Sequence, residues 1–287
     1  MPLLTMKEIL QKADASGYGV GAYNLLSMEA VKGAVCACET LQSPLILQIA
    51  EAQLETAPLN LMIPMMVQAA KDAYIPIAVH LDHGTTFKCI KTALALGCTS
   101  VMYDGAALPF DENIAKTKQA VKLAHDMGAT CEAELGVVGG SESGNLHTAK
   151  ELMTNVDQVY EFVERTGCDA LAIAIGNAHG PYVGEPNLNF ERLAEINKAV
   201  GVPLVLHGGS GISDEDFRKC VQLGICKINV GTSLQQNVAR KVKSLCCAAG
   251  ANDVSFLDIS VLSEAGVFEE ILAFTEIFGS GGKALNA

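Results

Sequence analysis

Four kinds of feature are missing from this 287-residue sequence, and each absence narrows its roles. The chain is acidic, with a formal net charge of −12, and has no cluster of Lys and Arg that would bind nucleic acid or an anionic membrane. No run approaches the roughly 20 apolar residues of a membrane-spanning helix. The first residues lack the basic start and apolar core of a signal peptide, and the ten cysteines include no C-x-x-C pair. We therefore expect a cytoplasmic protein with reduced, mostly buried cysteines and a small-molecule ligand.

Apolar material for a large core is abundant, because hydrophobic residues make up 49% of the chain and charged residues 18%. Eight short apolar runs predict β-strands, at 19–24, 44–50, 76–82, 99–104, 129–135, 170–176, 203–207 and 227–231. Several of them lack polar alternation, as parallel strands covered on both faces do. Helices are predicted between the strands, among them 27–41, 112–127, 155–165, 190–199 and 213–223.

Eight strand–helix units in a chain of this length predict an α/β fold, the (β/α)8 TIM barrel of about 250 residues. An open doubly wound sheet has the same alternation, but no G-x-G-x-x-G follows the first predicted strand. We expect one barrel domain over residues 1–287, in which 252–287 form a C-terminal helical extension that caps the barrel or mediates an oligomer contact. Residues 136–153 form a Gly- and Ser-rich loop, whose length indicates a mobile loop with a function.

Three of the six histidines occur as His-Gly just past a predicted strand: His83, His179 and His207. Active sites of TIM barrels lie where the strands end, so closure of the barrel would bring these side chains to one rim. Three imidazoles with one open position are the ligand set of a catalytic zinc ion. The alternative for each is an ordinary hydrogen-bonded histidine, but the shared pattern favours the metal. His80 and His125 lie inside a predicted strand and a predicted helix, where we expect structural roles.

Carboxylates gather at the same rim. Asp82 directly precedes His83, and it either exchanges a substrate proton beside the metal or orients a ligand histidine. Asp104 and Glu134 come from the ends of the fourth and fifth predicted strands, where they would support the ligands or form a second metal site. The residue pattern alone leaves both choices open.

A lysine-based mechanism is the alternative to a metal. Lys227 lies on the eighth predicted strand, and Glu132 on the fifth shares a strand face with Glu134. A buried Glu132–Lys227 ion pair is the simpler explanation of this lysine. A Schiff-base lysine needs a depressed pKa in an apolar pocket, and it would leave the three histidines without a purpose.

Two Gly-rich loops, HGGSG at 207–211 and NVGTS at 229–233, follow the seventh and eighth predicted strands and lead into helices. Loops at these places hold phosphate in TIM barrels, through backbone N–H groups and helix N-termini. A metal beside a phosphate site would polarise the oxygen of a phosphorylated carbonyl compound. Such chemistry covers aldol cleavage, isomerisation and epimerisation.

The chain resembles the class II, metal-dependent fructose/tagatose bisphosphate aldolase family in motifs that span most of the barrel. These are AYN at 22–24, SPLIL at 43–47, HLDHG at 80–84, MYDGA at 102–106, EAELG at 132–136, GG-x-E at 139–142, AIGNAHGPY at 174–182, PLVLHGGSG at 203–211 and KINVGT at 227–232. The resemblance implies reversible cleavage of a ketose (bis)phosphate to dihydroxyacetone phosphate and an aldehyde, through a zinc-stabilised enediolate. It also implies a homodimer or homotetramer.

The resemblance also implies roles for individual residues. His83, His179 and His207 would bind Zn²⁺, while Asp82 would exchange the proton of the hydroxyl whose C–C bond breaks. Glu142, in the long loop, would exchange the proton of the dihydroxyacetone phosphate carbon. Asp104 and Glu134 correspond to a second divalent site of some members, and a monovalent cation (Na⁺ or K⁺) is expected near the phosphate. The positions that hold dihydroxyacetone phosphate are Asn24, Gly180, Gly208, Gly209, Ser210, Asn229, Val230, Gly231 and Thr232.

Three positions depart from the family's fructose bisphosphate enzymes. Val183 replaces a lysine four residues after the second zinc histidine, Ala50 replaces a serine, and Gly231 replaces an acidic residue. Loss of the lysine removes a charge-assisted contact of about 1.5–3 kcal/mol. We therefore hypothesise an enzyme that still yields dihydroxyacetone phosphate but accepts a different aldehyde.

Two other functions fit the same residues. A metal-dependent ketose-phosphate epimerase or isomerase would use the same enediolate chemistry without releasing a triose phosphate. A non-catalytic barrel would bind a sugar phosphate as a sensor, with neither metal dependence nor turnover. The groups Asp82, His83 and Glu142 argue against the sensor, because binding alone does not need them.

Overall fold

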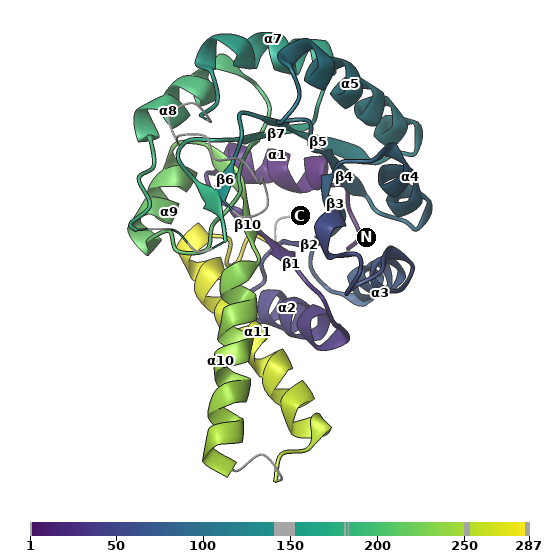
Figure 1. The fold of residues 1–287 in the computed structure, drawn as a ribbon, viewed down its shortest axis with the longest axis vertical. Coiled ribbons are helices and arrows are strands. Elements are labelled where there is room, and N and C mark those ends of the chain that lie inside the picture. The colour runs from purple at the N-terminus through teal and green to yellow at the C-terminus, as the bar shows by residue number, and fades with distance from the viewer. Residues whose placement is uncertain (1, 141–152, 181, 183, 250–252, 285–287) are drawn as a thin grey trace.

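Eight parallel strands close into a barrel with helices around it (Figure 1). The computed structural model describes residues 2–140, 153–180, 182, 184–249 and 253–284. The barrel strands, in chain order, are β1 (Val20–Asn24), β2 (Leu45–Ala50), β3 (Ile77–Gly84), β4 (Ser100–Tyr103), β5 (Thr130–Leu135), β7 (Ala170–Ile173), β9 (Leu204–Leu206) and β10 (Ile225–Val230). Each pairs in parallel with its neighbour in this order, and β1 pairs with β10. The predicted (β/α)8 TIM barrel is therefore confirmed.

The helices are α1 (Met6–Ser16), α2 (Met28–Thr40), α3 (Leu59–Asp72), α4 (Phe87–Ala95), α5 (Phe110–Asp126), α7 (Val156–Thr166), α8 (Phe190–Ala199), α9 (Asp214–Gln222), α10 (Thr232–Ala249) and α11 (Phe256–Phe278). Several begin at a side chain that accepts a hydrogen bond from a backbone N–H of the first turn, as at Ser27, Thr86 and Ser213. These short polar residues stop the preceding loop and start the helix, which is why the predicted boundaries agree closely with the observed ones.

The N-terminal helix α1 closes one end of the barrel. Its buried residues Met6, Ile9 and Leu10 pack against side chains inside the barrel, such as Ile46 and Ala78. The main core lies between the outer faces of the strands and the surrounding helices. Because α1 fills the amino-terminal end of the barrel interior, this interior is accessible from the carboxyl ends of the strands.

Helices α10 and α11 form a hairpin that extends away from the barrel (Figure 1). Helix α11, the main part of the extension predicted at 252–287, packs against α2 and α10. A Cβ atom at Gly33 of α2 would lie 2.6 Å from the carbonyl oxygen of Glu264, so glycine permits this close approach. Val267 and Ile271 are buried here, whereas Phe256 at the tip is exposed.

Two further sequence predictions concern the cysteines and membrane spans. All ten cysteines are free and seven of them are buried, which agrees with their predicted role as small apolar residues. Within the described ranges, no helix combines the length and the apolar character needed to cross a bilayer.

Candidate active site

Three histidines meet above the carboxyl ends of the strands. The ring centroid of His83 lies 4.7 Å from that of His179 and 4.6 Å from that of His207, and the last two are 5.7 Å apart. One nitrogen from each ring lies within 4.8 Å of the others, as in a set of ligands to one metal ion. Residues 124 positions apart in sequence, His83 and His207, are thus brought together as the sequence analysis predicted.

A local irregularity of β3 aims His83 at this point. Successive side chains of a regular strand point to opposite faces, yet Asp82 and His83 line the same cavity. The pairing of β3 with β4 shifts register between Leu81 and Gly84, and His83 adopts a left-handed φ of 44°. Such bulges redirect side chains next to active sites. The strand therefore continues through His83 rather than ending before it, which differs from the predicted range.

His179 is held by a second, smaller sheet. The barrel strand β7 ends at Ile173, earlier than the predicted 176, and His179 lies on β8 (Ala178–His179), which pairs with β6 (Gly139–Gly140). The side chain of Asn177 organises the connection: its Oδ1 accepts the N–H of Ile175, and its Nδ2 donates to the carbonyl of His207. The backbone that carries His179 is thereby attached to the backbone of a second histidine.

Carboxylates determine which nitrogen of each imidazole faces the centre. Nε2–H of His207 donates to Glu132 Oε1 at 2.9 Å, and Nδ1–H of His83 donates to Asp104 Oδ2 at 2.9 Å. The remaining nitrogens, Nδ1 of His207 and Nε2 of His83, face each other at 2.9 Å. A proton on either nitrogen makes this contact a hydrogen bond, and a metal ion in place of that proton would be bound by both lone pairs. The residues present therefore fit a bound metal ion.

The electrostatics favour a positive charge at the same point. Burial lowers the pKa of His83, but the carboxylates of Asp82, Asp104 and Glu134 outweigh burial and raise it to about 10. Burial and the nearby charge of His83 lower the pKa of His179 to about 3. Burial also lowers the pKa of His207. The surrounding carboxylates thus stabilise one cation among three imidazoles.

Asp82 is a buried carboxylate held by three amides. It accepts hydrogen bonds from Asn24 Nδ2 at 2.9 Å, Gln48 Nε2 at 3.2 Å and Asn229 Nδ2 at 3.0 Å. Burial alone would raise the pKa of Asp82, but His83, together with further nearby cationic groups, holds it well below its usual range. Asp82 is therefore ionised and fixed in position beside the histidines.

Gln48 is the residue of this group that sequence reasoning missed. It is fully buried and lies in the middle of β2, where its amide also donates to Asn24 Oδ1 at 3.0 Å. The available signal was a single glutamine inside the apolar run LILQIA. An uncompensated amide in such a run is costly, so a polar partner inside the barrel had to exist.

Asp104 and Glu134 lie where the second metal site was predicted. Together with His83 they form a second group whose ligand atoms lie within 4.8 Å of one another. Burial and the charge of Asp104 raise the pKa of Glu134 well above its ordinary value. Asp104 supports His83 directly, as described above, and the geometry is also compatible with a second cation.

The Glu132–Lys227 pair has the simpler of the two predicted roles. Lys227 Nζ lies 2.8 Å from Glu132 Oε2, and both side chains are fully buried.

The two remaining described histidines lie outside the group of three. His80 bonds Ser100 Oγ through Nδ1 at 2.8 Å and has a structural role, as predicted. Burial and Lys227 lower its pKa to about 3, so His80 is neutral. His125, on α5, lies away from the site, and its Nε2 is 2.8 Å from Asp169 Oδ2.

A cavity of about 110 Å³ lies beside the three histidines. It is lined by Asn24, Ala50, Gln53, Asp82, His83, His179, Gly180, Gly208, Gly209, Ser210, Asn229, Gly231, Thr232 and Gln235. All the predicted substrate-binding residues line it except Val230, whose side chain packs in the hydrophobic core. Position 230 can therefore contribute only its backbone.

The two Gly-rich loops form one wall of this cavity. Ser210 Oγ accepts the N–H of Ser233 at 2.9 Å, which connects the loop after β9 to the start of α10. A Cβ atom at Gly208 would lie 2.2 Å from the carbonyl oxygen of Ala178, so only glycine fits there. No Lys or Arg of the described ranges lines the cavity. An anion at this wall would be bound by backbone N–H groups and the N-terminus of α10.

Two predicted features lie outside the described residues. These are Glu142, with the loop segment 141–152 that carries it, and Val183.

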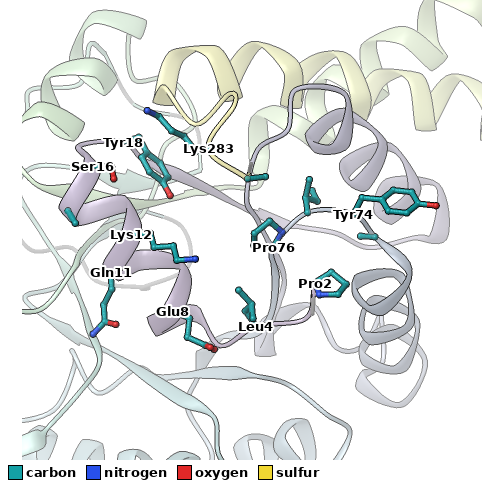
Figure 2. Close-up of a pocket in the computed structure, with 14 residues that line it drawn as sticks. Pro2, Leu4, Glu8, Gln11, Lys12, Ser16, Tyr18, Tyr74, Pro76 and Lys283 are labelled. Atoms are coloured by element: carbon teal, nitrogen blue, oxygen red, sulfur yellow. The ribbon is translucent and has the colours of Figure 1, made fainter. Parts of the chain in front are cut away.

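A larger cavity of about 800 Å³ lies at the other end of the barrel (Figure 2). Residues of α1, such as Lys12, and of the segment before β3, such as Tyr74 and Pro76, line it together with Lys283. It contains none of the predicted site residues, because α1 separates it from the carboxyl ends of the strands.

Comparison with known proteins places this geometry among aldolases. Residues 4–283 match the family model described as "Fructose-bisphosphate aldolase class-II". The chain is 43% identical over 251 residues to a "Probable fructose-bisphosphate aldolase" of Bacillus subtilis (strain 168), covering 86% of this chain and 88% of that protein. The crystal structure of the YdjI aldolase from Escherichia coli K12 superposes with a TM-score of 0.88 at 38% identity, covering 98% of this chain and 99% of that one. A structure from Coccidioides immitis, titled a putative fructose-1,6-biphosphate aldolase, gives a TM-score of 0.89 at 28% identity, with 98% of each chain covered.

Proposed function

The chain belongs to the class II fructose-bisphosphate aldolase family, and we propose that this aldolase depends on Zn²⁺ bound by His83, His179 and His207. The observation that carries the proposal is the convergence of three imidazoles, one nitrogen of each lying within 4.8 Å of the others, with Asp104 and Glu132 bonded to two of them. A zinc ion held there would act as a Lewis acid for the negative charge that develops on the ketose oxygens during C–C cleavage.

Asp82 is the residue that removes the proton of the hydroxyl next to the C–C bond that breaks. In the cleavage direction a base removes the proton of the hydroxyl, the C–C bond breaks, and an aldehyde forms. Asp82 suits this role because it is ionised, adjacent to His83 and part of the cavity wall. Its three amide partners, Asn24, Gln48 and Asn229, hold the carboxylate in place. Glu142, assigned by the family resemblance, would return a proton to the dihydroxyacetone phosphate carbon.

The phosphate of dihydroxyacetone phosphate would lie on the wall formed by the Gly-rich loops. This part of the proposal rests on the lining residues Gly180, Gly208, Gly209, Ser210, Gly231 and Thr232. A monovalent cation, Na⁺ or K⁺, next to this phosphate belongs to the same proposal. A KM for the ketose phosphate that depends on the identity of the monovalent ion, at constant ionic strength, would support it.

Replacing Gly208 by alanine tests the phosphate wall. The added methyl would collide with Ala178 O, and φ at this position is 66°, so the loop and the neighbouring His179 must shift. We expect kcat/KM for ketose-phosphate cleavage to fall by about 10², the cost of a misplacement of about 1 Å. Gly201→Ala is the matched control, because its methyl meets nothing within 4 Å. Equal activities of the two variants would contradict this assignment.

A second cation at Asp104 and Glu134 is also proposed, on the basis of the ligand group that they form with His83. Metal analysis of the Glu134→Gln variant tests it. We expect the loss of one bound ion per chain, with the ion at the three histidines retained, whereas an unchanged metal content would contradict the second site.

The C-terminal hairpin supports a homodimer or homotetramer. Phe256, Leu257 and Val261 near the tip of α11 are largely exposed, and grouped apolar side chains of this kind mark interaction surfaces. Val267 and Ile271 of the same helix belong to the barrel's main core, so we propose that barrel and hairpin form one domain. Sedimentation velocity of the intact chain measures the oligomeric state.

Removal of the metal tests the proposed function as a whole. We expect EDTA to reduce the rate of triose phosphate release from a ketose phosphate to below a tenth of the rate of the untreated enzyme. Added Zn²⁺ should restore this rate. Borohydride with substrate should leave activity intact, because Lys227 is paired with Glu132. Conversion of one ketose phosphate into another without triose phosphate would instead support an epimerase or isomerase. Metal-independent binding without turnover would support a sensor.

A further inference from the structure

Apart from the histidines, Asp82 and its amide partners, the lining of the catalytic cavity falls into two groups that differ in chemistry. One group is the wall of Gly-rich loops, and the other, called here the second end, comprises Ala50, Gln53 and Gln235. Ala50 is the register partner of Asp82 across the β2–β3 pair, and Gln53 accepts the N–H of Ala50, so both residues lie near Asp82. If one half of the substrate carries its phosphate to the loops and the cleaved bond is next to Asp82, the aldehyde half must extend toward Ala50, Gln53 and Gln235.

This second end is built from neutral amides. Gln53 ends the short 3-10 helix Glu51–Gln53 after β2, and its Oε1 accepts the N–H of Ala50 at 3.2 Å. That bond orients the side chain, while its Nε2 group makes no hydrogen bond to a described residue. Gln235 lies in the first turn of α10 and also lines the cavity. Amides both donate and accept hydrogen bonds, which suits the hydroxyl groups of a sugar.

Positive charge is absent from this end as far as the described residues extend. The nearest buried lysine, Lys227, does not line the cavity and is paired with Glu132. The neighbouring hollow on the other side of His83 is lined by the carboxylates of Glu51, Asp104 and Glu134. A second phosphate group close to the ionised Asp82 would therefore meet like charges and, among the described residues, no counter-ion, which disfavours its binding.

We propose that the preferred substrate is a ketose 1-phosphate whose aldehyde half is uncharged and hydroxylated, and that Gln53 and Gln235 determine this specificity. The proposal rests on the proposed aldolase function and defines its substrate class. The single phosphate binds to the loops through backbone N–H groups, and the rest of the substrate binds to neutral amides.

The condensation reaction tests the aldehyde half alone, because dihydroxyacetone phosphate can be kept constant. We would measure its consumption by the zinc-loaded enzyme with glyceraldehyde and, separately, with glyceraldehyde 3-phosphate. We expect kcat/KM to be at least tenfold higher for glyceraldehyde. The variant Gln235→Lys should move this ratio at least tenfold toward the phosphorylated aldehyde, by supplying the missing charge. Gln236→Lys, an exposed neighbour on α10 outside the cavity lining, is the matched control and should leave the ratio unchanged.

The outcomes separate this proposal from the proposed function. Preference of the parent enzyme for glyceraldehyde 3-phosphate would overturn the substrate class while leaving the aldolase activity in place. No condensation with either aldehyde would overturn the proposed function itself. Should Gln235→Lys not fold, Gln53→Lys provides the same test. An unchanged ratio in a folded variant at either position would remove that glutamine from the specificity-determining pair.

Discussion

Replacing Asp82 by alanine is expected to lower kcat for ketose-phosphate cleavage by a factor of about 10² to 10⁴, the usual contribution of a positioned acid–base residue. The carboxylate lines the cavity beside the histidines and is ionised, so it can accept the hydroxyl proton. Bound zinc should stay, because the three histidines that we propose as ligands are unchanged. Steady-state cleavage rates and metal content of the purified variant measure both effects.

A partial reaction distinguishes a catalytic role of Asp82 from a general disturbance of the site. We propose that Glu142 exchanges the C–H proton of dihydroxyacetone phosphate with solvent, so this exchange should survive in Asp82→Ala. Asp126→Ala, which removes an exposed carboxylate on α5, is the control and should have parental activity. If the metal-bound Asp82→Ala variant cleaved the ketose phosphate at a rate within tenfold of the parental rate, another group would have to move the proton.

Replacing Lys227 by methionine is expected to destabilise the fold by about 3–5 kcal/mol, the cost of leaving one partner of a buried ion pair alone. Lys227 and Glu132 are 2.8 Å apart, and both are fully buried. Methionine keeps most of the volume of the lysine, so the change removes charge rather than packing. The free energy of unfolding in urea, measured on EDTA-treated protein, reports the effect without a contribution from metal binding.

Lys122→Met is the matched control for this prediction. Lys122 forms an ion pair of 2.7 Å with Asp126, but both side chains are mostly exposed. Exposed pairs contribute about 0–1 kcal/mol, so the control should be almost as stable as the parent. The two ion pairs have nearly the same length and differ in burial, so equal effects would contradict the role assigned to burial.

The barrel could be predicted because its signals are local. Strands covered on both faces appear as short apolar runs, and Ser27 and Ser213 mark the starts of helices through their capping bonds. The Gly-rich sequences after β9 and β10 marked two loops that line the cavity in the structure. Each signal extends over a few residues, so a single sequence is enough to find it.

Two features of the site could not be predicted in this way. The left-handed His83 and the register shift beside it depend on the pairing of β3 with β4, and the position of His179 on β8 depends on pairing with β6. Gln48 attracted no attention because its partners, Asn24 and Asp82, lie on other strands. Such contacts join residues far apart in the chain, and no local pattern encodes them.

The amino-acid sequence by itself determined the alternation of strands and helices, the residue types able to bind a metal, and the loops suited to a phosphate, since all of these depend on neighbouring residues. Closure of the barrel decided the rest. It placed Glu132 and Asp104 against the histidines, which decides that Nδ1 of His207 and Nε2 of His83 face each other, and it gathered three amides around Asp82. It also brought Gln53 and Gln235, which are far apart in the chain, to the lining of the same cavity. The physical reason is that the protonation of an imidazole and the charge of a cavity depend on distances in space, which only the folded chain defines.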